Sequence, residues 1–204
     1  MSEEMQETQV SQPETPEKSS FENTIYDWAK SLIAAVVAVI LMFTFLVRLI
    51  GVNGPSMQDT LYTGDRLVVL NSMFCDYKPG DVVVVNAYNA QLNETIVKRI
   101  IAVGGQIVDV DFFTGTVYVD GVPLDEPYAK EPTFTSDGTR FPLLLQEDEV
   151  FLMGDNRNHS TDSRSVLLGA VKEDYIQGKA VFLLFPGQTP SLGKREWGRI
   201  GLIR

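Results

Sequence analysis

A single apolar segment constrains the fold of this chain more than any other feature. Residues 31–47 contain no charged side chain and are flanked by Lys30 and Arg48. Together with Trp28 and the apolar residues 49–50, the segment reaches the ~20 residues that a helix needs to cross the hydrocarbon core of a bilayer. A tryptophan near one end suits the membrane interface, where amphipathic rings are enriched. The sequence therefore predicts a transmembrane helix over residues 25–50.

Two other structures could account for such a segment, and the sequence disfavours both. A cleaved signal peptide starts with a short basic region and ends in a small-x-small pattern, whereas a long acidic region precedes this segment and no such pattern follows it. A core helix of a small soluble domain keeps a polar stripe, but this segment is apolar on every face. We therefore expect the helix to be retained in the mature protein.

The region before the helix differs sharply in composition from the rest of the chain. Residues 1–24 are rich in Glu, Gln, Ser, Thr and Pro, so they predict a disordered acidic tail. Residues 1–27 contain seven acidic residues and one lysine, and they carry −6 of the net charge of −10. This acidic balance, without interleaved basic and aromatic residues, excludes a nucleic-acid-binding surface. Basic residues are too evenly placed around the helix for the positive-inside rule to give its orientation.

The remaining residues, 51–204, read as a β-rich domain. Short runs of β-branched residues are bounded by Gly, Pro and Asp, and the pair Asp120-Gly121 is a two-residue hairpin signal. Residues 172–177 alone predict a short helix, and residues 123–147, with four prolines, predict a small irregular excursion. The predicted fold class is mainly β, with antiparallel β-sheets folded over one core and one N-terminal transmembrane α-helix. The predicted strands are residues 66–70, 81–85, 95–103, 106–111, 116–119, 149–153 and 180–185.

Ser56 is the first candidate for chemistry, because it follows the apolar segment by a few residues in Gly-Pro-Ser-Met. A serine hydroxyl is a poor nucleophile near neutral pH and needs an adjacent base. The chain has one histidine, but Lys98 lies in an apolar strand, where burial would lower its pKa from ~10.4 towards the working pH. A serine–lysine pair is a known variant of the catalytic triad. Residues 154–164, Gly-Asp-Asn-Arg-Asn-His-Ser-Thr-Asp-Ser-Arg, add a dense set of polar groups.

These three segments, in this order, resemble the type I signal peptidases, membrane-bound serine–lysine peptidases that remove signal peptides from exported proteins. The resemblance extends from about Tyr26 to the C-terminus, and residues 154–164 are its most specific part. It implies that Ser56 is acylated, that the Ser56 N–H helps form the oxyanion hole, and that neutral Lys98 is the base. It also implies that the Ser160 hydroxyl orients Lys98. Supporting ion pairs are expected from Asp155, Arg157, Asp162 and Arg164.

The resemblance also implies a substrate, a location and partners. Signal peptides carry small residues at the first and third positions before the cut, and an extended peptide sends these side chains the same way, into two shallow apolar pockets. The expected linings, which could equally be core residues, are Ile50, Val52, Met57, Leu61, Ile96 and Val97. The enzyme would span the cell membrane once, with a cytoplasmic N-terminus and the catalytic domain on the extracytoplasmic side. Membrane lipids and the protein-export machinery are further expected partners.

Three positions depart from the family pattern. Gly54 stands where some members have a serine that donates to the oxyanion, Asp59 stands where proline is frequent, and Gly105 stands where aspartate is usual. Arg99, beside Lys98, is expected either to help depress the lysine pKa or to lie at the surface.

Other chemistries remain as alternatives. Ser56, His159 and Asp162 could form a conventional triad, and Cys75 with His159 could form a cysteine peptidase site. No cluster of side chains has metal-ligand spacing, so we expect neither a metal nor a cofactor. A catalytically silent, membrane-anchored binding domain is the rival from another class. A soluble serine–lysine self-cleaving regulator would need a DNA-binding domain in place of the apolar helix.

Overall fold

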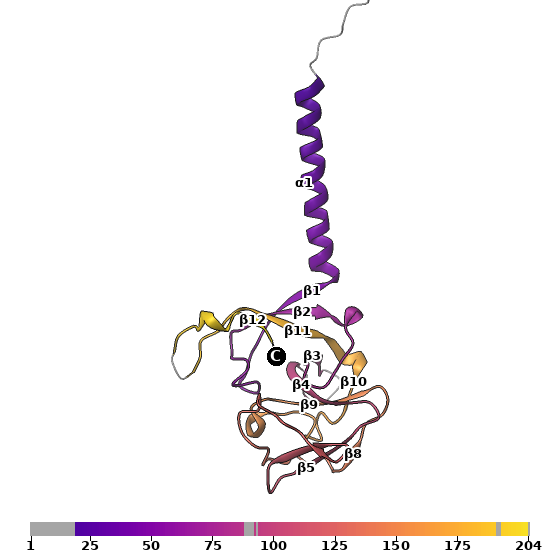
Figure 1. Ribbon diagram of the computed structural model, residues 1–204, viewed down its shortest axis with the longest axis vertical. Helices are drawn as coiled ribbons and strands as arrows, with labels where there is room; N and C mark the ends of the chain where they lie inside the picture. The colour runs from indigo at the N-terminus through magenta and orange to yellow at the C-terminus, as the bar shows by residue number, and fades with distance from the viewer. Residues whose placement is uncertain (1–18, 88–91, 93, 191–192, 204) are drawn as a thin grey trace, which may run out of the picture. The chain divides into compact units, whose positions relative to one another are not determined.

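The structure is a computed structural model that describes residues 19–87, 92, 94–190 and 193–203. The chain divides into two compact units, residues 1–41 and residues 42–204, which are described separately (Figure 1). Of the expected tail, residues 1–18 lie outside the described residues.

The N-terminal unit consists of helix α1 (Ser19–Phe45), whose last turn runs into the second unit. An 18-residue stretch within Asn23–Phe45 has a mean hydropathy of 2.1, and by length and composition this part of the helix could cross a membrane. The predicted helix boundaries, residues 25 and 50, are wrong at both ends. Residues 19–24 are helical rather than part of the tail, and residues 47–51 form a strand.

That strand, β1 (Val47–Gly51), explains the error at the end of the helix. It pairs antiparallel with β2 (Arg66–Asn71), from Val47 opposite Leu70 to Gly51 opposite Arg66. A short apolar stretch cannot be identified as helix or strand from its composition alone. The partner strand, about twenty residues further along the chain, decides the outcome here by supplying a hydrogen-bonding ladder.

The larger sheet has eight strands, one of which contains Lys98, and the turn that contains Ser56 follows β1. All its pairings are antiparallel. In spatial order the strands are β1, β2, β11 (Ile176–Phe185), β3 (Val82–Asn86), β4 (Thr95–Val103), β9 (Glu149–Met153) and β10 (Val171–Lys172), with β12 (Gly201–Leu202) also pairing with β11.

A second sheet of four strands is built from the segment that follows β4. In order it contains β7 (Val122–Pro123), β6 (Thr116–Val119), β5 (Ile107–Asp111) and β8 (Leu143–Leu144), and its pairings are antiparallel. The predicted hairpin joins β6 to β7, and both of its turn residues have positive φ: 52° at Asp120 and 77° at Gly121. Most of the predicted excursion, residues 123–147, is irregular, but its ends pair into this sheet as β7 and β8.

The predicted strands are all confirmed to within a few residues at their ends, and the predicted helix over residues 172–177 is wrong. Its residues form the end of β10, a single 3₁₀ turn, η3 (Glu173–Tyr175), and the start of β11. Pairing of Lys172 with Glu149 and of Ile176 with Val85 overrides the local helical preference.

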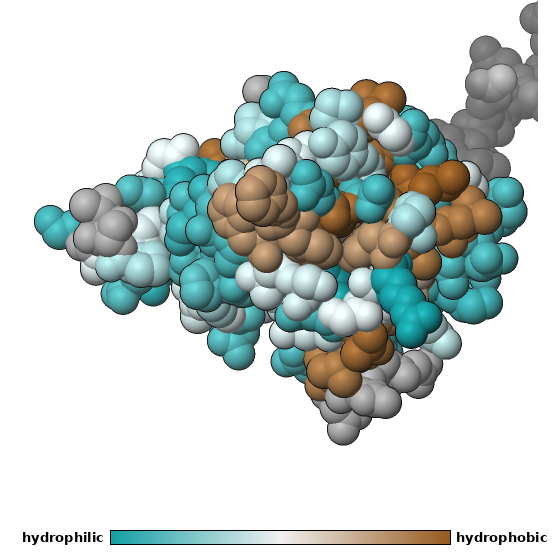
Figure 2. All heavy atoms as spheres, turned by 90° about the horizontal axis from the view of Figure 1, so that it is seen from below, coloured by the Kyte–Doolittle hydropathy of each residue, from teal (hydrophilic) through white to brown (hydrophobic). Residues whose placement is uncertain are grey.

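Three buried apolar clusters hold the β-rich unit together. The first contains Val52, Met57 and Leu61, so the segment that carries Ser56 is anchored in the core on both sides of the serine. Some apolar side chains remain exposed, including Phe113, which is 94% exposed. On the face seen from below, apolar side chains form several patches between hydrophilic side chains (Figure 2).

Candidate active site

A cleft of about 290 Å³ brings the three sequence segments together. Ser56 comes from the turn after β1, Lys98 from β4, and His159 from the loop after β9. A slightly larger cleft, of about 350 Å³, lies beside β6 and contains neither Ser56 nor Lys98. The lining of the first cleft is Asn53, Gly54, Pro55, Ser56, Glu94, Thr95, Ile96, Val97, Lys98, His159 and Thr161.

The turn that carries Ser56 is fixed from both sides. Met57 and Leu61 are each 1% exposed, and the Leu61 N–H donates to the Met57 carbonyl at 2.7 Å. On the other side, the Gly54 N–H donates to Thr63 Oγ1 at 3.1 Å, and that hydroxyl donates to the Gly54 carbonyl at 3.2 Å. Gly54 has a φ of 100°, which a residue with a Cβ adopts only at a cost, so the departure from serine here also suits the turn.

Lys98 is buried on β4 and only 3% exposed. Its pKa is lowered to about 8, mainly because burial strips the ammonium of its hydration, and the nearby Arg164 contributes to the lowering. The carboxylates of Asp162, Glu94 and Asp155 oppose this effect. With a pKa of about 8, roughly one molecule in ten has a neutral amine at pH 7, and most do above pH 9. Lys98 can therefore act as a base in mildly alkaline solution.

Ser160 lies near Ser56 but does not make the expected hydrogen bond to Lys98. Its hydroxyl is buried and has no hydrogen-bond partner among the described residues, so it does not bond to Lys98 in this structure. A Cβ at Gly154 would overlap both Ser160 Oγ and the Ser56 carbonyl oxygen. Gly154 is thus required for the close approach of the residue 154–164 loop to the turn that carries Ser56.

The expected ion pairs are buried, and two of them have partners that the sequence did not indicate. Arg99 binds Asp155 through two hydrogen bonds of 2.9 and 2.7 Å. Arg157 binds Glu126, in the irregular excursion, at 2.7 and 2.6 Å. The excursion therefore stabilises the loop of residues 154–164 beside the cleft.

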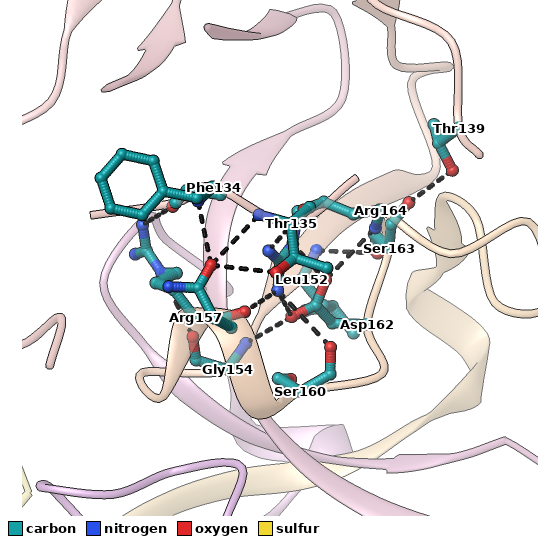
Figure 3. A network of polar contacts seen from close by, with 12 residues as sticks. Phe134, Thr135, Thr139, Leu152, Gly154, Arg157, Ser160, Asp162, Ser163 and Arg164 are labelled. Atoms are coloured by element: carbon teal, nitrogen blue, oxygen red, sulfur yellow. Dashed lines mark hydrogen bonds and ion pairs between the residues drawn. The ribbon is translucent and has the colours of Figure 1, made fainter. Parts of the chain in front are cut away.

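Asp162 and Arg164 form the third pair, as expected. Arg164 donates from Nε to one Asp162 oxygen at 2.8 Å and from Nη2 to the other at 2.7 Å. The Gly154 N–H also donates to Asp162 at 3.0 Å, and Arg164 reaches the carbonyl of Arg157 at 2.6 Å (Figure 3). Asp162 thus closes the loop on itself.

The expectation that Arg99 could lie at the surface is wrong. Arg99 is 1% exposed, so it is not a surface arginine. Adjacent residues of a strand point to opposite faces, so Arg99 turns away from Lys98 towards Asp155. Among basic groups, Arg164 contributes most to the lowered pKa of Lys98.

The alternative catalytic sets are not assembled. His159 lines the same cleft as Ser56, but both oxygens of Asp162 are bound by Arg164, so the third member of a conventional triad is already engaged. Cys75 does not line the cleft, and its thiol donates to the carbonyls of Leu70 and Asn71 at the end of β2. No group of three His, Cys, Asp or Glu side chains in the described part of the chain could hold a metal ion.

The expected substrate-binding residues fall into two groups. Ile96 and Val97 line the cleft. Val52, Met57 and Leu61 belong to the first buried cluster and do not line it, and Ile50 packs against that cluster. These four therefore support the turn that carries Ser56, which is the core role that the sequence left open.

One edge of the cleft is an unpaired piece of strand. β9 pairs with β4 only from Arg99 onward, so residues 95–98 lack a neighbour on that side among the described strands. The Ala87 N–H donates to the Glu94 carbonyl, and the Ile100 N–H donates to Asp81, so the even-numbered residues of β4 bond to β3. The backbone groups of Thr95 and Val97 consequently point to the open edge.

Sequence reasoning missed three contributors to this site. Glu94 lines the cleft, Glu126 binds Arg157, and Asn156 donates to the backbone beside Ser56. Glu94 could have been suspected from its position four residues before Lys98, immediately before β4. The other two depend on contacts between distant segments, which no local pattern reveals.

Comparison with known proteins assigns most of the chain to one family. Residues 25–185 match the family described as "Signal peptidase, peptidase S26". The chain is 36% identical over 179 residues to "Signal peptidase I" of Bacillus amyloliquefaciens, covering 83% of this chain and 93% of that relative. It is 35% identical over 179 residues to "Probable signal peptidase I-1" of Synechocystis sp., covering 83% of each. A solved signal peptidase I from Enterococcus faecalis V583 is 26% identical, with a TM-score of 0.42, and the match covers 52% of this chain and 97% of that chain.

Proposed function

This chain belongs to the signal peptidase family, peptidase S26, whose members are serine endopeptidases that remove signal peptides, and we propose that Ser56 and Lys98 form its catalytic dyad. The observation that carries this proposal is the placement of both side chains in one cleft, with the Lys98 pKa lowered to about 8. A serine beside a lysine that can lose its proton meets the requirement for an activated nucleophile.

The reaction proceeds in two halves. Neutral Lys98 takes the proton of the Ser56 hydroxyl as Ser56 Oγ attacks the scissile carbonyl carbon. The Ser56 N–H, which has no acceptor among the described residues, donates to the carbonyl oxygen as it becomes negative. When the intermediate collapses, Lys98 gives its proton to the leaving amine and an acyl-enzyme remains. Water, deprotonated by Lys98, then attacks the ester carbonyl, and the proton returns to Ser56 Oγ as the signal peptide leaves.

The signal peptide binds in extended form along the open edge of β4. The free backbone groups of Thr95 and Val97 form its main-chain hydrogen bonds, as when a strand is added to a sheet. Alternate side chains of the peptide share one face and enter the cleft, whose lining includes Ile96 and Val97. A shallow cleft lined by these residues favours small side chains near the cut.

Location follows from the helix and from the substrate. The span Asn23–Phe45 anchors the enzyme in the cell membrane, with the N-terminal tail in the cytoplasm and the β-rich unit on the extracytoplasmic side. Preproteins bearing signal peptides are held in the same bilayer, so both reactants are confined to one surface. Membrane lipids and the protein-export machinery are the proposed partners there.

The test is cleavage of a preprotein by detergent-solubilised protein. Ser56→Ala and Lys98→Met should each lower turnover by at least ~1,000-fold, since removing a member of a catalytic set leaves only the residual effect of binding. Lys98→Arg should also fail, because a guanidinium keeps its proton. His159→Ala should retain most activity. Turnover by Lys98→Met close to that of the native enzyme would refute the dyad, and a loss in His159→Ala equal to that in Ser56→Ala would restore the triad.

A further inference from the structure

Asn156 holds both peptide units that flank Ser56. Its side-chain Nδ2 donates to the Pro55 carbonyl at 3.1 Å, and its backbone N–H donates to the Ser56 carbonyl at 3.0 Å. Asn156 is only 2% exposed, and it reaches the Ser56 turn from a loop about a hundred residues later in the sequence. Gly154, which has no Cβ to overlap the Ser56 carbonyl, permits this approach.

These two contacts determine where the Ser56 N–H points. A trans peptide unit is planar, so its C=O and N–H groups are fixed in opposite directions. The Pro55 carbonyl and the Ser56 N–H belong to the same unit. A donor held on the Pro55 oxygen therefore sets the direction of the Ser56 N–H. The second bond holds the following unit through the Ser56 carbonyl, so Ser56 is fixed on both sides.

We propose that Asn156 is a positioning residue that aims the Ser56 N–H at the oxygen of the scissile carbonyl. This proposal rests on the proposed function, in which that N–H donates to the developing oxyanion. A hydrogen bond weakens steeply as its angle departs from linear, so a peptide unit free to rock would donate poorly at the moment of reaction. A unit held in advance needs no reorganisation then.

The remaining atom of the Asn156 side chain indicates that its role is not simply structural. Oδ1 is buried and has no hydrogen-bond partner among the described residues. A buried polar atom without a partner costs about 1–3 kcal/mol. An asparagine with one amide end paired and the other unpaired stabilises the fold poorly, whereas its Nδ2 is the donor that the Pro55 carbonyl requires.

The experiment compares two asparagines of the same loop in the full-length protein in detergent. Asn156→Asp keeps the shape of the side chain but replaces the Nδ2 donor with an acceptor facing the Pro55 oxygen. Asn158→Asp is the matched control, because Asn158 Nδ2 also donates to a proline carbonyl, that of Pro132, at 3.1 Å. Cleavage of a peptide spanning a signal-peptide junction gives kcat and KM for both variants and for Asn156→Ala.

We expect kcat to fall about 10- to 100-fold in Asn156→Asp and Asn156→Ala, with KM within about threefold of native, since removal of one oxyanion donor costs about 100- to 1,000-fold. Asn158→Asp should stay within about threefold of native in both constants. The acid limb of the Asn156→Ala pH profile should keep its midpoint, because that variant changes no charge near Lys98. A kcat for Asn156→Asp within twofold of native, or an equal loss in Asn158→Asp, would overturn the proposal.

A second measurement does not depend on how much of each variant folds. A peptide aldehyde accepts Ser56 Oγ at its carbonyl carbon while Lys98 takes the Ser56 proton, leaving the aldehyde oxygen charged in the oxyanion position. The matching peptide alcohol cannot form this bond. The ratio of the two inhibition constants, alcohol over aldehyde, should fall by the same factor as kcat/KM in Asn156→Ala. An unchanged ratio would overturn the proposal even if activity is lost.

Failure of this proposal is distinguishable from failure of the proposed function. If the native protein does not cleave the peptide, or if Ser56→Ala still does, the dyad is wrong and the role of Asn156 falls with it. If the native protein cleaves, Ser56→Ala is inactive and Asn156→Asp behaves as native, only the positioning role is refuted.

Discussion

Burial of Lys98 lowers the stability of the fold but makes its side chain usable as a base. An ammonium group that is 3% exposed and has no ion pair among the described residues loses most of its hydration. The same loss of hydration brings its pKa to about 8, where the neutral amine becomes available.

The first residue-scale prediction concerns the pH dependence of activity. Because the neutral amine is the base, kcat/KM should rise with pH through a midpoint near 8. Glu94 lines the same cleft and raises the Lys98 pKa, so Glu94→Gln should move the acid limb to lower pH. Glu173→Gln, on η3 and outside the cleft, is the control and should leave the limb in place. A limb that shifts upward in Glu94→Gln would contradict the assignment of Lys98.

The second prediction concerns stability. The folded-state pKa of Lys98 lies below its ordinary value of 10.5, so between about pH 8 and 10.5 the unfolded state binds more protons. The free energy of unfolding contributed by this group should therefore rise with pH across that window. Lys98→Met should remove this contribution to the slope and raise stability at pH 7 by about 1–3 kcal/mol. Urea unfolding of native and variant protein at pH 7.5 and 10 measures both effects, and a steeper slope in the variant would refute the pKa.

At the scale of elements, the loop of residues 154–164 is held by charges rather than by strands. Arg157 binds Glu126 in the excursion, and Arg99 on β4 binds Asp155. Both arginines are 1% exposed, so each pair is shielded from solvent. The excursion and β4 thus both hold the loop, and Asn156 in the loop binds the turn that carries Ser56.

The prediction at this scale compares a buried pair with an exposed one. Glu126→Gln leaves the buried Arg157 guanidinium without its carboxylate and should destabilise the protein by about 3–5 kcal/mol. Asp148→Asn breaks the exposed pair with Lys172 and should cost no more than about 1 kcal/mol. Chemical unfolding in detergent measures both. Equal small losses would mean that the excursion does not support the loop.

At the scale of the whole molecule, the helix can be removed without loss of the β-rich unit only by a cut before β1, and not at the predicted helix end at residue 50. Residues 47–51 belong to the sheet, so a truncation that removes them would expose the edge of β2. The anchor that can be removed ends at Phe45.

Removal of residues 1–45 should therefore leave a folded enzyme. It should still cleave a soluble peptide in detergent, while cleavage of a preprotein in a membrane should fall by about 100-fold or more, because the anchor raises the effective concentration of substrate. Removal of residues 1–51 is the matched control and should give an insoluble or unstable protein. A soluble, folded 46–204 fragment that cuts no peptide would mean that the helix takes part in catalysis.

Local sequence patterns determined much of this protein. The apolar span, the β-branched runs and the Asp120-Gly121 turn each act over a few residues, so their helix, strands and hairpin could be predicted. The Ser56 and Lys98 segments and residues 154–164 were also visible as motifs, and the structure brings them to one cleft. Their chemistry as a dyad remains a prediction.

Only the tertiary structure decided the rest, because it depends on pairing between distant residues. β1 is a strand because β2 lies beside it, and residues 172–177 are not a helix because β9 and β3 pair with them. Met57 and Leu61 belong to the core rather than to the cleft, the buried Arg99 binds Asp155, and Glu126 in the excursion binds Arg157. Asn156 meets Ser56 only when the chain is folded. Free energies of burial and pairing between such segments are properties of the assembled fold, which no short stretch of sequence contains.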